Sequence, residues 1–557
     1  MPSNRSILPL LLALSLYAGP IHAAKPADQV ARMEALRSAS VASDHESAVE
    51  LASGIVASNP DLTEAWYLLG RHAEALDRHE LAISASSRAW ELGYHHMPWI
   101  AARIARAAAA LGKKELSFEW LRKALAAGLE DRQRIAKWEV FEKYLEDPEF
   151  REIAAMAPEG MTRLSGLRSD IDLLVEEAQR LHADPERPAF RAEFVEAADI
   201  LRKRAGDLTD AEVVHEIQRL TALLGDGHSV SYGPQKESPL KIESARLPIK
   251  VYLFEEGMYA IDSYDPATEW LVGRRVVSIG ARSPEALLAA SRQIHGSDNR
   301  MTMIWLGPQF YFTDTEFLRF AEAIGETSEV QLEIERDDGG VEPIVVEAGD
   351  YPIIRKLHAP DVIEGEIPLY LRRVDANYWL HELPDHSALY FQFNQVRDDE
   401  SEPIAAFAER LASSLDADTN NLIIDVRHNN GGNNGLLRPL LRQIIAFDTR
   451  SGTQVFVITG RNTFSAAQNF ITRLERMTEA LFVGEPSSSS PNFTGEETEL
   501  VLPWSRIAIS ISSRYWQDSD PGDERPSIAP DIRVTPTAKD YFTGRDTAMG
   551  AILEIIQ

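Results

Sequence analysis

The chain has 557 residues, a formal net charge of -29 at pH 7 and 44% hydrophobic residues. This length supports two or more domains with cores of their own, and the acidic balance disfavours a general nucleic-acid binder, which needs a basic surface. The chain contains no cysteine, which excludes disulfides, thiolate catalysis, zinc sites with cysteine ligands and a lipid-modified N-terminal cysteine. We therefore expect a multidomain protein that does not bind nucleic acid.

Residues 1–24 have the layout of a secretory signal peptide. A positive charge at Arg5 precedes an apolar run over residues 7–16, and small residues stand at Ala23 and Ala24. The run is too short for a good membrane span, and no later segment approaches the roughly 20 apolar residues that a spanning helix needs. The sequence thus predicts export to the periplasm or the extracellular space, with no membrane span in the mature chain.

The segment 43–157 has apolar residues three and four positions apart and breaks at "NPDL" and "LGYHHMP", which predicts consecutive amphipathic helices. Trp66 and Gly70 in "AWYLLGRHA" have the spacing of a tetratricopeptide repeat, and Trp99 recurs 33 residues after Trp66. In the second unit Arg103 stands where the glycine belongs. The segment resembles two degenerate repeats of this family, and an ordinary helical cap is the alternative. Either arrangement offers a surface to adaptor proteins, substrate proteins or the neighbouring domain.

Residues 165–235 are predicted to be mainly helical and end in "LTALLGDGHSVSYG". Gly225 falls where a helix ends, because glycine tolerates the left-handed conformation of helix caps. Gly227 then permits a sharp turn. This leaves His228 at the head of a short extended run, where it is either a functional side chain or an idle, exposed one.

Residues 240–350 mix strands and helices. "LPIKVYLF", "MYAID", "RRVVSIG" and "EVQLEIERDDGGVEPIVVE" predict strands, with a hairpin turn at "DDGG", and "SPEALLAASRQI" predicts a helix. "LVGRRVVSIGARSPEALLAA" followed by the late hairpin resembles a PDZ-like module with a long insertion between its helix and its last strands. No glycine-rich carboxylate-binding loop is evident, so capture of a substrate C-terminus is left open.

Residues 360–557 alternate strands and helices, which predicts an α/β layer. In "IIDVRHNNGGNNG", Gly431 and Gly432 leave backbone amides open to a negative oxygen, and a plain glycine turn is the alternative. In "TFSAAQNF", Ser465 lies where a strand gives way to a helix, and it is either a helix cap or a nucleophile. The whole chain is predicted to be multidomain, α and α/β, with an N-terminal helical repeat region, a PDZ-like α+β module and a C-terminal α/β core.

The motifs "DGH", "IIDVRHNNGG", "TFSAAQNF", "VGEPSSSSPNFTG" and "SIAPDIRV" occur in that order. Together they resemble the C-terminal processing (tail-specific) serine peptidase family, in particular its tricorn-core-like branch, over residues 171–557. The resemblance implies that Ser465 is the nucleophile and that the amides of Ala466 and of the pair Gly431 and Gly432 form the oxyanion hole. It implies cleavage of extended or unfolded polypeptides through an acyl-enzyme, without cofactor or metal.

The same resemblance suggests the base and the acid. Relatives with a lysine base carry it 25 residues after the serine, where this chain has Ser490. The branch without the lysine uses the histidine of a "DGH" motif, which His228 matches, and a glutamate six residues before the proline of a "PD" pair, which Glu524 matches. Two departures are Gly227, where the tricorn core has a relay serine, and Gln468, where many relatives have glutamate. A histidine base predicts activity that rises with pH through a pKa of about 6 to 7, shifted by its neighbours.

Other functional classes fit less well. The chain lacks the HExxH zinc motif and the GxSxG motif of α/β-hydrolases. The main alternative is a non-catalytic binding or scaffold protein, in which the repeats recruit partners and the peptidase-like domain only binds. Retention of serine, histidine and glutamate together favours the enzyme.

Overall fold

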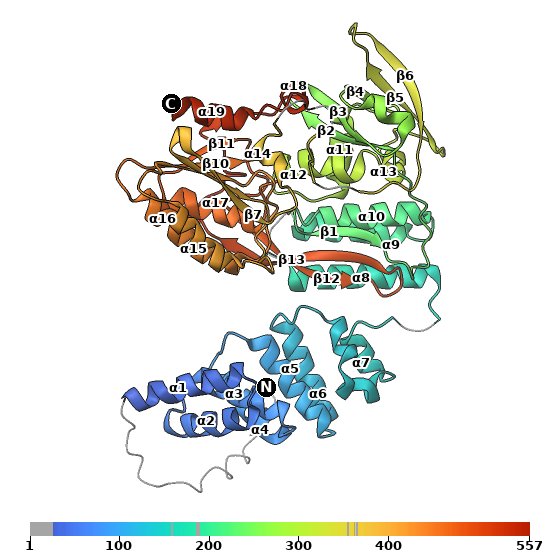
Figure 1. Cartoon of the computed structure of the whole chain (residues 1–557). Helices are drawn as coiled ribbons and strands as arrows, with labels where there is room; N and C mark the ends of the chain where they lie inside the picture. Colours follow the sequence, from blue (N-terminus) through green and yellow to red (C-terminus); the bar gives the residue numbers. More distant parts are fainter. Residues whose placement is uncertain are drawn as a thin grey trace. The chain divides into compact units, whose positions relative to one another are not determined.

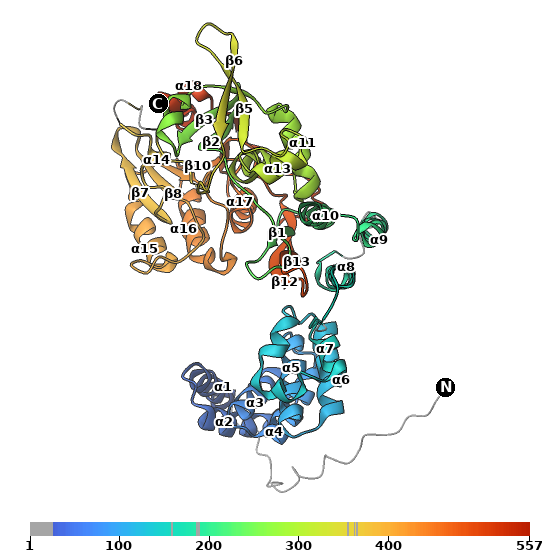
Figure 2. The same ribbon diagram turned by 90° about the vertical axis from the view of Figure 1, so that its right-hand side faces the viewer.

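The computed structural model describes residues 26–157, 160–184, 190–353, 356–360, 363 and 366–556. Two compact units, Met1–Glu159 and Gly160–Gln557, divide the chain, and each is described by itself (Figures 1 and 2). The predicted signal peptide lies outside the described residues. Within the described ranges, no helix combines the length and the apolarity that crossing a bilayer requires.

The first unit consists of short helices, and each α-helix packs against the next α-helix along the chain. Alanines at the contacts let the helices approach closely, and Ala82 and Ala89 are fully buried. Gly70 is needed for the same reason, because a Cβ there would lie 2.4 Å from the hydroxyl of Ser86. Assignment of these helices to the tetratricopeptide family stays a prediction. The elements are α1 (Pro26–Val41), α2 (His45–Ser58), α3 (Thr63–Ala75), α4 (His79–Glu91), α5 (Met97–Ala110), α6 (Lys114–Ala126), η1 (Gln133–Lys137), η2 (Glu139–Tyr144) and α7 (Pro148–Ile153).

A six-stranded sheet with the order β14-β11-β10-β9-β8-β7 lies in the second unit, parallel except for the β7–β8 pair. Its central strands are apolar on both faces, as strands of covered parallel sheets are. Leu422 and Ile424 pack under helices α15, α16 and α17, whereas Ile423 packs toward α19 on the opposite face (Figure 1). The elements are α14 (Leu369–Arg372), β7 (Tyr378–Leu383), η6 (Pro384–His386), β8 (Ala388–Phe393), α15 (Ile404–Ser414), β9 (Asn421–Asp425), η7 (Asn434–Leu436), α16 (Arg438–Asp448), β10 (Gln454–Thr459), α17 (Ala466–Met477), β11 (Leu481–Gly484), β14 (Ile532–Arg533), α18 (Ala538–Phe542) and α19 (Thr547–Ile555).

A second sheet, β1-β13-β12, joins segments that are far apart in the sequence. Strand β1 pairs antiparallel with β13, with Val230 opposite Ser510, and β13 forms a hairpin with β12. Helix α10 packs against β1 and helix α8 against β13. The segment that carries His228 and the last third of the chain therefore share one layer. The elements are α8 (Arg163–Leu181), η3 (Phe190–Phe194), α9 (Val195–Arg204), α10 (Asp210–Ala222), β1 (Val230–Pro234), β12 (Asn492–Val501) and β13 (Ile507–Gln517).

Residues 249–347 form two small antiparallel sheets, β2-β3 and β4-β5-β6, around a shared apolar core with helix α11. The hairpin of β5 and β6 turns at Gly339, which has a φ of 81°. The predicted strands and the predicted helix of this region are present, while its assignment as a PDZ-like module stays a prediction. The elements are β2 (Ile249–Phe254), β3 (Gly257–Ser263), η4 (Pro266–Leu271), β4 (Val276–Ile279), α11 (Pro284–Ile294), α12 (Arg300–Leu306), η5 (Gly307–Tyr311), α13 (Thr315–Phe320), β5 (Glu329–Glu335) and β6 (Val341–Glu347).

Candidate active site

Ser465 occupies the turn between strand β10 and helix α17. Its backbone has φ 55° and ψ -125°, and its side chain makes no capping hydrogen bond to the helix. A non-glycine residue at positive φ is strained, and such strain persists only where the surrounding structure imposes it. The interpretation of Ser465 as a helix cap therefore lacks its hydrogen bond, and the half-buried side chain lies on the wall of a cleft.

Hydrogen bonds to the neighbouring loop fix this turn. The Thr463 hydroxyl donates to the carbonyl of Val426 at 3.0 Å and accepts from the amide of Gly460 at 3.0 Å. The amide of Phe464 donates to the carbonyl of Asn429 at 3.1 Å. Two of these bonds reach the loop after β9, so two adjacent strand ends hold the serine in its strained conformation.

The glycine pair after β9 lies directly against the serine. A Cβ on Gly431, whose φ is 109°, would lie 2.7 Å from Cβ of Ser465 and 2.8 Å from the amide nitrogen of Ala466. A Cβ on Gly432, whose φ is 134°, would lie 2.2 Å from the carbonyl oxygen of Val396. Any other residue would push the loop away, so glycine is what brings this backbone next to Ser465.

Two backbone amides beside Ser465, those of Gly432 and Ala466, have no hydrogen-bond partner among the described residues. The amide of Gly431, in contrast, donates to Oδ1 of Asn429 at 2.9 Å. Ala466 is the first residue of α17, where amides have no acceptor within the helix and the helix dipole is positive. The two open amides and the helix end favour a negative oxygen at this position.

His228 lies in the turn between helix α10 and strand β1. Oδ1 of Asp226 accepts the amide of His228 at 2.9 Å and the amide of Ser229 at 2.8 Å. The hydroxyl of Ser510 donates to the carbonyl of His228 at 2.7 Å. Because Ser510 belongs to β13, the backbone of the histidine is held both by its own turn and by the distant hairpin.

The imidazole of His228 is stacked on two phenylalanine rings. Its centroid lies 4.3 Å from that of Phe464, at an interplanar angle of 21°, and 5.5 Å from that of Phe493, at 10°. Gly227 makes room for this arrangement, because a Cβ there would lie 2.9 Å from Cε2 of Phe464. The departure from the tricorn-like pattern at Gly227 thus has a packing reason, since the Phe464 ring occupies the space that a serine side chain would need.

Burial determines the charge of His228. The residue is 4% exposed, and neither ring nitrogen makes a hydrogen bond of regular geometry. Desolvation lowers its pKa to about 4, against the opposing influence of the Asp226 charge and of a looser contact with the Thr494 backbone. The imidazole is therefore neutral above about pH 4, which is the state that a base needs. In this conformation the pKa lies below the range of about 6 to 7 that the sequence predicted.

Asp226 holds together a buried polar network to which sequence reasoning gave no role. Its carboxylate accepts from Nε2 of His182 at 3.0 Å and from the hydroxyl of Ser512 at 2.5 Å. Nδ1 of His182 accepts the amide of Asp184, which places the ring proton on Nε2. Burial alone would raise the pKa of Asp226, but the bonds from His182 and Ser512 outweigh it and hold the pKa at about 2. The only sequence signal for this role was the aspartate of the "DGH" motif itself.

Glu524 is exposed and does not line the cleft. The neighbouring acid in the same turn, Asp523, is held by hydrogen bonds. It accepts from Nε of Arg525 at 2.9 Å and from the hydroxyl of Ser519 at 2.6 Å. The bonds from Arg525 lower the pKa of Asp523 well below its usual range. Glu524 is thus not among the residues that line the Ser465 cleft, and its role as the acid of the set stays a prediction.

One cleft of about 1320 Å³ is lined by the other predicted residues except Gly431. Ser465, His228, Gly432 and Ala466 all line it. Small-molecule pockets typically measure about 300 to 1,000 Å³, so this cleft has room for a longer ligand. Aromatic side chains supply much of its wall, namely Tyr232, Trp305, Phe310, Tyr311, Phe317, Phe464 and Trp516.

No family model and no curated protein matches the chain, whereas solved structures do. Mature CPAF complexed with lactacystin aligns with a TM-score of 0.53 and 14% identity, over 71% of this chain and 98% of that chain. Mature CPAF by itself aligns with a TM-score of 0.51 and 14% identity, over 70% and 96%. The photosystem II D1 C-terminal processing protease aligns with a TM-score of 0.34 and 12% identity, over 69% and 98%.

At this level of identity the likeness to CPAF shows a shared fold. The alignment covers 98% of the CPAF chain and 71% of this chain. The share of this chain is close to that of residues 171–557, over which the motifs occur. The resemblance predicted from the motifs is therefore confirmed as a fold, and the activity rests on the site itself.

Proposed function

We propose that this chain is an exported serine peptidase that cleaves extended or unfolded polypeptides. The observation that carries the proposal is the strained, uncapped Ser465 at the start of α17, packed against Gly431 in the cleft that His228 also lines. A serine that only caps a helix needs neither positive φ nor a glycine loop against its Cβ. Export is supported by the layout of residues 1–24.

The proposed reaction is acyl transfer. Oγ of Ser465 attacks the carbonyl carbon of the scissile bond as His228 takes its proton, and the amides of Gly432 and Ala466 bind the oxyanion. The imidazolium then protonates the leaving amine, which leaves an ester on Ser465. A water molecule that gives its proton to the same imidazole hydrolyses the ester, and that proton returns to Oγ. Gly431 is a third donor only when its amide leaves Asn429.

This chemistry requires His228 to move. No hydrogen bond joins Ser465 and His228 among the described residues, and the imidazole is stacked on Phe464 and Phe493. We expect substrate to displace Phe464, which adjoins Ser465, and to let the ring turn toward the serine. Apo structures of enzymes commonly hold catalytic groups farther apart than the working complex does.

A fluorophosphonate probe tests the proposal, because it modifies only a serine whose hydroxyl is activated. We expect the probe to label the wild-type protein at Ser465, as located by peptide mass spectrometry, and not to label Ser465→Ala. The matched control is Ser413→Ala, an exposed serine on α15, which should keep full labelling. Absence of label on folded wild-type protein, together with intact casein after incubation, would contradict the proposal.

That negative result would favour a second function, non-catalytic binding of polypeptides in the same cleft. Two observations support this alternative: both ring nitrogens of His228 lack regular hydrogen bonds, and Glu524 is exposed. Binding of labelled casein to wild-type protein without cleavage, measured by fluorescence anisotropy, would identify it. For either function, the helices of the first unit are proposed to bind adaptor or substrate proteins.

A further inference from the structure

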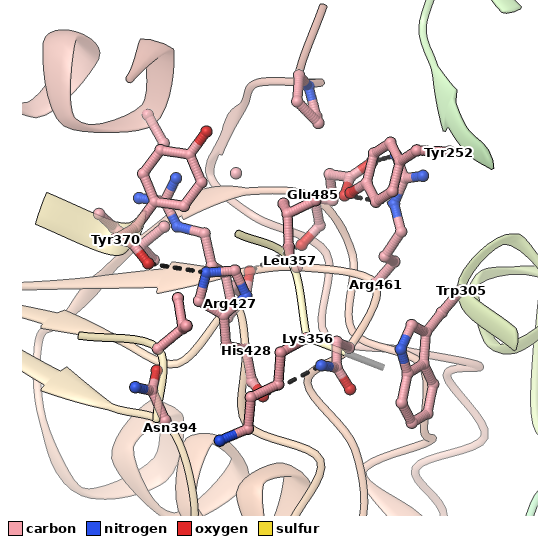
Figure 3. A pocket seen from close by; sticks show the side chains of 18 of the residues that line it. Tyr252, Trp305, Lys356, Leu357, Tyr370, Asn394, Arg427, His428, Arg461 and Glu485 are labelled. Atoms are coloured by element: carbon pink, nitrogen blue, oxygen red, sulfur yellow. Dashed lines mark hydrogen bonds and ion pairs between the residues drawn. The ribbon is translucent and has the colours of Figure 1, made fainter. Parts of the chain in front are cut away.

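A second cavity, of about 390 Å³, lies at the carboxyl ends of the parallel strands (Figure 3). Asn394 follows β8, Arg427 follows β9, Arg461 follows β10 and Glu485 follows β11, and all four line it. Ligands of open α/β sheets bind at this edge, outside the strand ends. The cavity also takes a wall from Tyr252 of β2, so two layers of the second unit enclose it.

The charged side chains that line this cavity are paired with one another, and Arg427 also pairs with the buried Asp425, which does not line it. The charged side chains of its described lining form four pairs: Arg427 with Asp546, Arg461 with Glu485, Lys356 with Asp375, and Arg545 with Asp540. The first two pairs are largely buried and the Lys356–Asp375 pair is exposed, whereas the last pair joins the exposed Arg545 to the buried Asp540. His428, whose pKa burial lowers to about 4, adds no charge at pH 7. An ionic ligand would find no free counter-charge here, so the lining suits an uncharged occupant.

Two acceptor atoms of the lining lack partners. Oε1 of Gln309 and Oδ1 of Asn462 are both buried without a hydrogen bond. The amide of Asn462 is fixed in orientation, because its Nδ2 donates to the carbonyl of His428 at 3.1 Å. An unpaired buried acceptor is costly, and the N–H groups of a peptide backbone would satisfy both atoms.

Aromatic rings supply the apolar part of the lining. The ring of Tyr252 lies 4.7 Å from the guanidinium of Arg461, and the ring of Tyr370 lies 4.3 Å from that of Arg427. Figure 3 shows Tyr370 and Trp305 on opposite sides of the cavity. Tyr252 and Trp305 are only partly buried, so their rings offer apolar surface to aliphatic or aromatic side chains of an occupant.

The cavity and the Ser465 cleft share part of their walls. Trp305, Leu306, Phe310 and Asn430 line both. The cavity and the cleft are therefore adjacent, and only these four residues lie between a polypeptide in the cleft and the cavity. We infer that the cavity is a distal subsite, which binds an uncharged stretch of the substrate polypeptide with aliphatic or aromatic side chains, beyond the residues that flank the scissile bond.

This inference rests on the proposed peptidase function, and the test separates the two. Cleavage sites in casein, an unfolded protein, are first mapped by mass spectrometry. Two peptides are then built on one site: a short one of about 8 residues, which spans up to about 28 Å, and a long one of about 20 residues. The long peptide exists in two versions, with neutral aromatic residues or with lysines in its extension.

Two variants change the cavity without touching residues shared with the cleft. Asn377→Trp fills it, and Gln309→Ala removes an unpaired acceptor, while Gln331→Ala on the exposed face of β5 is the matched control. We expect Asn377→Trp to lower kcat/KM for the long aromatic peptide about tenfold more than for the short one, and Gln309→Ala about threefold more. Equal losses on both peptides, or equal rates for the aromatic and lysine versions in wild-type protein, would overturn the inference.

Binding gives a readout that does not need catalysis. In the Ser465→Ala background, fluorescence anisotropy should show Kd for the long aromatic peptide raised about tenfold by Asn377→Trp and unchanged by Gln331→Ala. If wild-type protein cleaves nothing, the long peptides are built on a casein segment that binds it, and the same Kd difference would then mean that the proposed function fails and the subsite remains. If the cavity instead binds a neutral trisaccharide that the peptide does not displace, the subsite is wrong.

Discussion

The turn that carries Ser465 and the turn that carries His228 are built in opposite ways. The first lies between adjacent elements, β10 and α17, and its fixing bonds reach only the loops after the neighbouring strands β9 and β11. The second depends on residues from both ends of the unit, because His182 and Ser512 meet at Asp226. A strand-to-helix crossing places a side chain through local geometry, whereas the histidine turn is placed only when distant segments have assembled.

Because of this difference, substitutions at Ser465 and substitutions around His228 should have different effects. The serine is strained but rigidly held, so changes to it should affect chemistry and leave the fold intact. The histidine turn combines a buried charge with stacked rings, so changes around it should affect chemistry and stability together. The predictions below test this separation.

Ser465→Ala should have the largest effect on activity. Loss of the nucleophile should lower kcat by at least about 10³-fold, measured on a casein-derived peptide. Because Ser465 makes no capping hydrogen bond, the free energy of unfolding should fall by less than the roughly 1 kcal/mol that loss of a helix cap costs.

Ser465→Gly sharpens the same point. Glycine accepts positive φ without strain, so this variant should be as inactive as the alanine variant and more stable than wild-type protein by about 1 kcal/mol. Chemical denaturation monitored by circular dichroism would check it. A glycine variant less stable than the alanine variant would show that the φ of 55° stores no strain.

Glu524→Gln should have the second-largest effect on kcat. If Glu524 supports the imidazolium in the working enzyme, the variant should fold and bind substrate normally and lose roughly 10² in kcat. The control is Asp520→Asn, an exposed acid of the same turn whose hydrogen bonds use only its backbone carbonyl. Asp523 is unsuitable because it binds Arg525 and Ser519. A full-rate Glu524→Gln enzyme would remove Glu524 from the site.

Asp226→Asn should lower both stability and activity. An asparagine cannot accept on both sides, and its NH₂ would face the Nε2 proton of His182, whose tautomer is fixed by the amide of Asp184. We expect a loss of about 2 kcal/mol in unfolding free energy and about tenfold in kcat, since the negative charge beside His228 is gone. Asp337→Asn, at a side chain 95% exposed, is the matched control. Wild-type stability in Asp226→Asn would contradict the histidine-turn argument.

The smallest expected effect on activity is that of pH on kcat/KM over the neutral range. With a pKa of about 4, His228 is neutral above that value, so kcat/KM should rise with pH through about 4 and stay flat from about 5 to 7. An apparent pKa near 6.5 would show instead that the working imidazole faces water.

Stability should fall on the acid side for the same reason. His215, His228, His295 and His428 each have a pKa lowered to about 4 by burial, against about 6.5 when unfolded. Between these values the unfolded chain binds more protons, so the unfolding free energy should decrease as pH falls from about 6.5 to 4. His215→Gln should reduce this acid loss and the exposed His381→Gln should not, as measured by denaturant titration at several pH values.

Much of the α/β layer was predictable because its signals are local. "NLIIDVR" and "TQVFVITG" are continuous apolar runs, and the structure makes them β9 and β10, while "SAAQNFITRLERM" has helical periodicity and becomes α17. The proximity of Ser465 and the glycine pair was implied by the family resemblance, and the structure explains it, because both follow parallel strands that end at one edge of the sheet. The hairpin of β12 and β13 was not predicted, although it supplies Phe493, Ser510 and Ser512 to the histidine turn.

The sequence by itself determined the order of most strands and helices of the α/β layer, the candidate nucleophile, the glycine loop and the histidine of the "DGH" turn, because periodicity, glycine and motif spacing are properties of neighbouring residues. Only the tertiary structure decided that Ser465 is strained and uncapped, that Phe464 packs on His228, and that the carboxylate of Asp226 holds the His228 backbone. Val230 pairs with Ser510 across 280 positions, and no local pattern encodes such a contact, since it forms only when a buried layer closes.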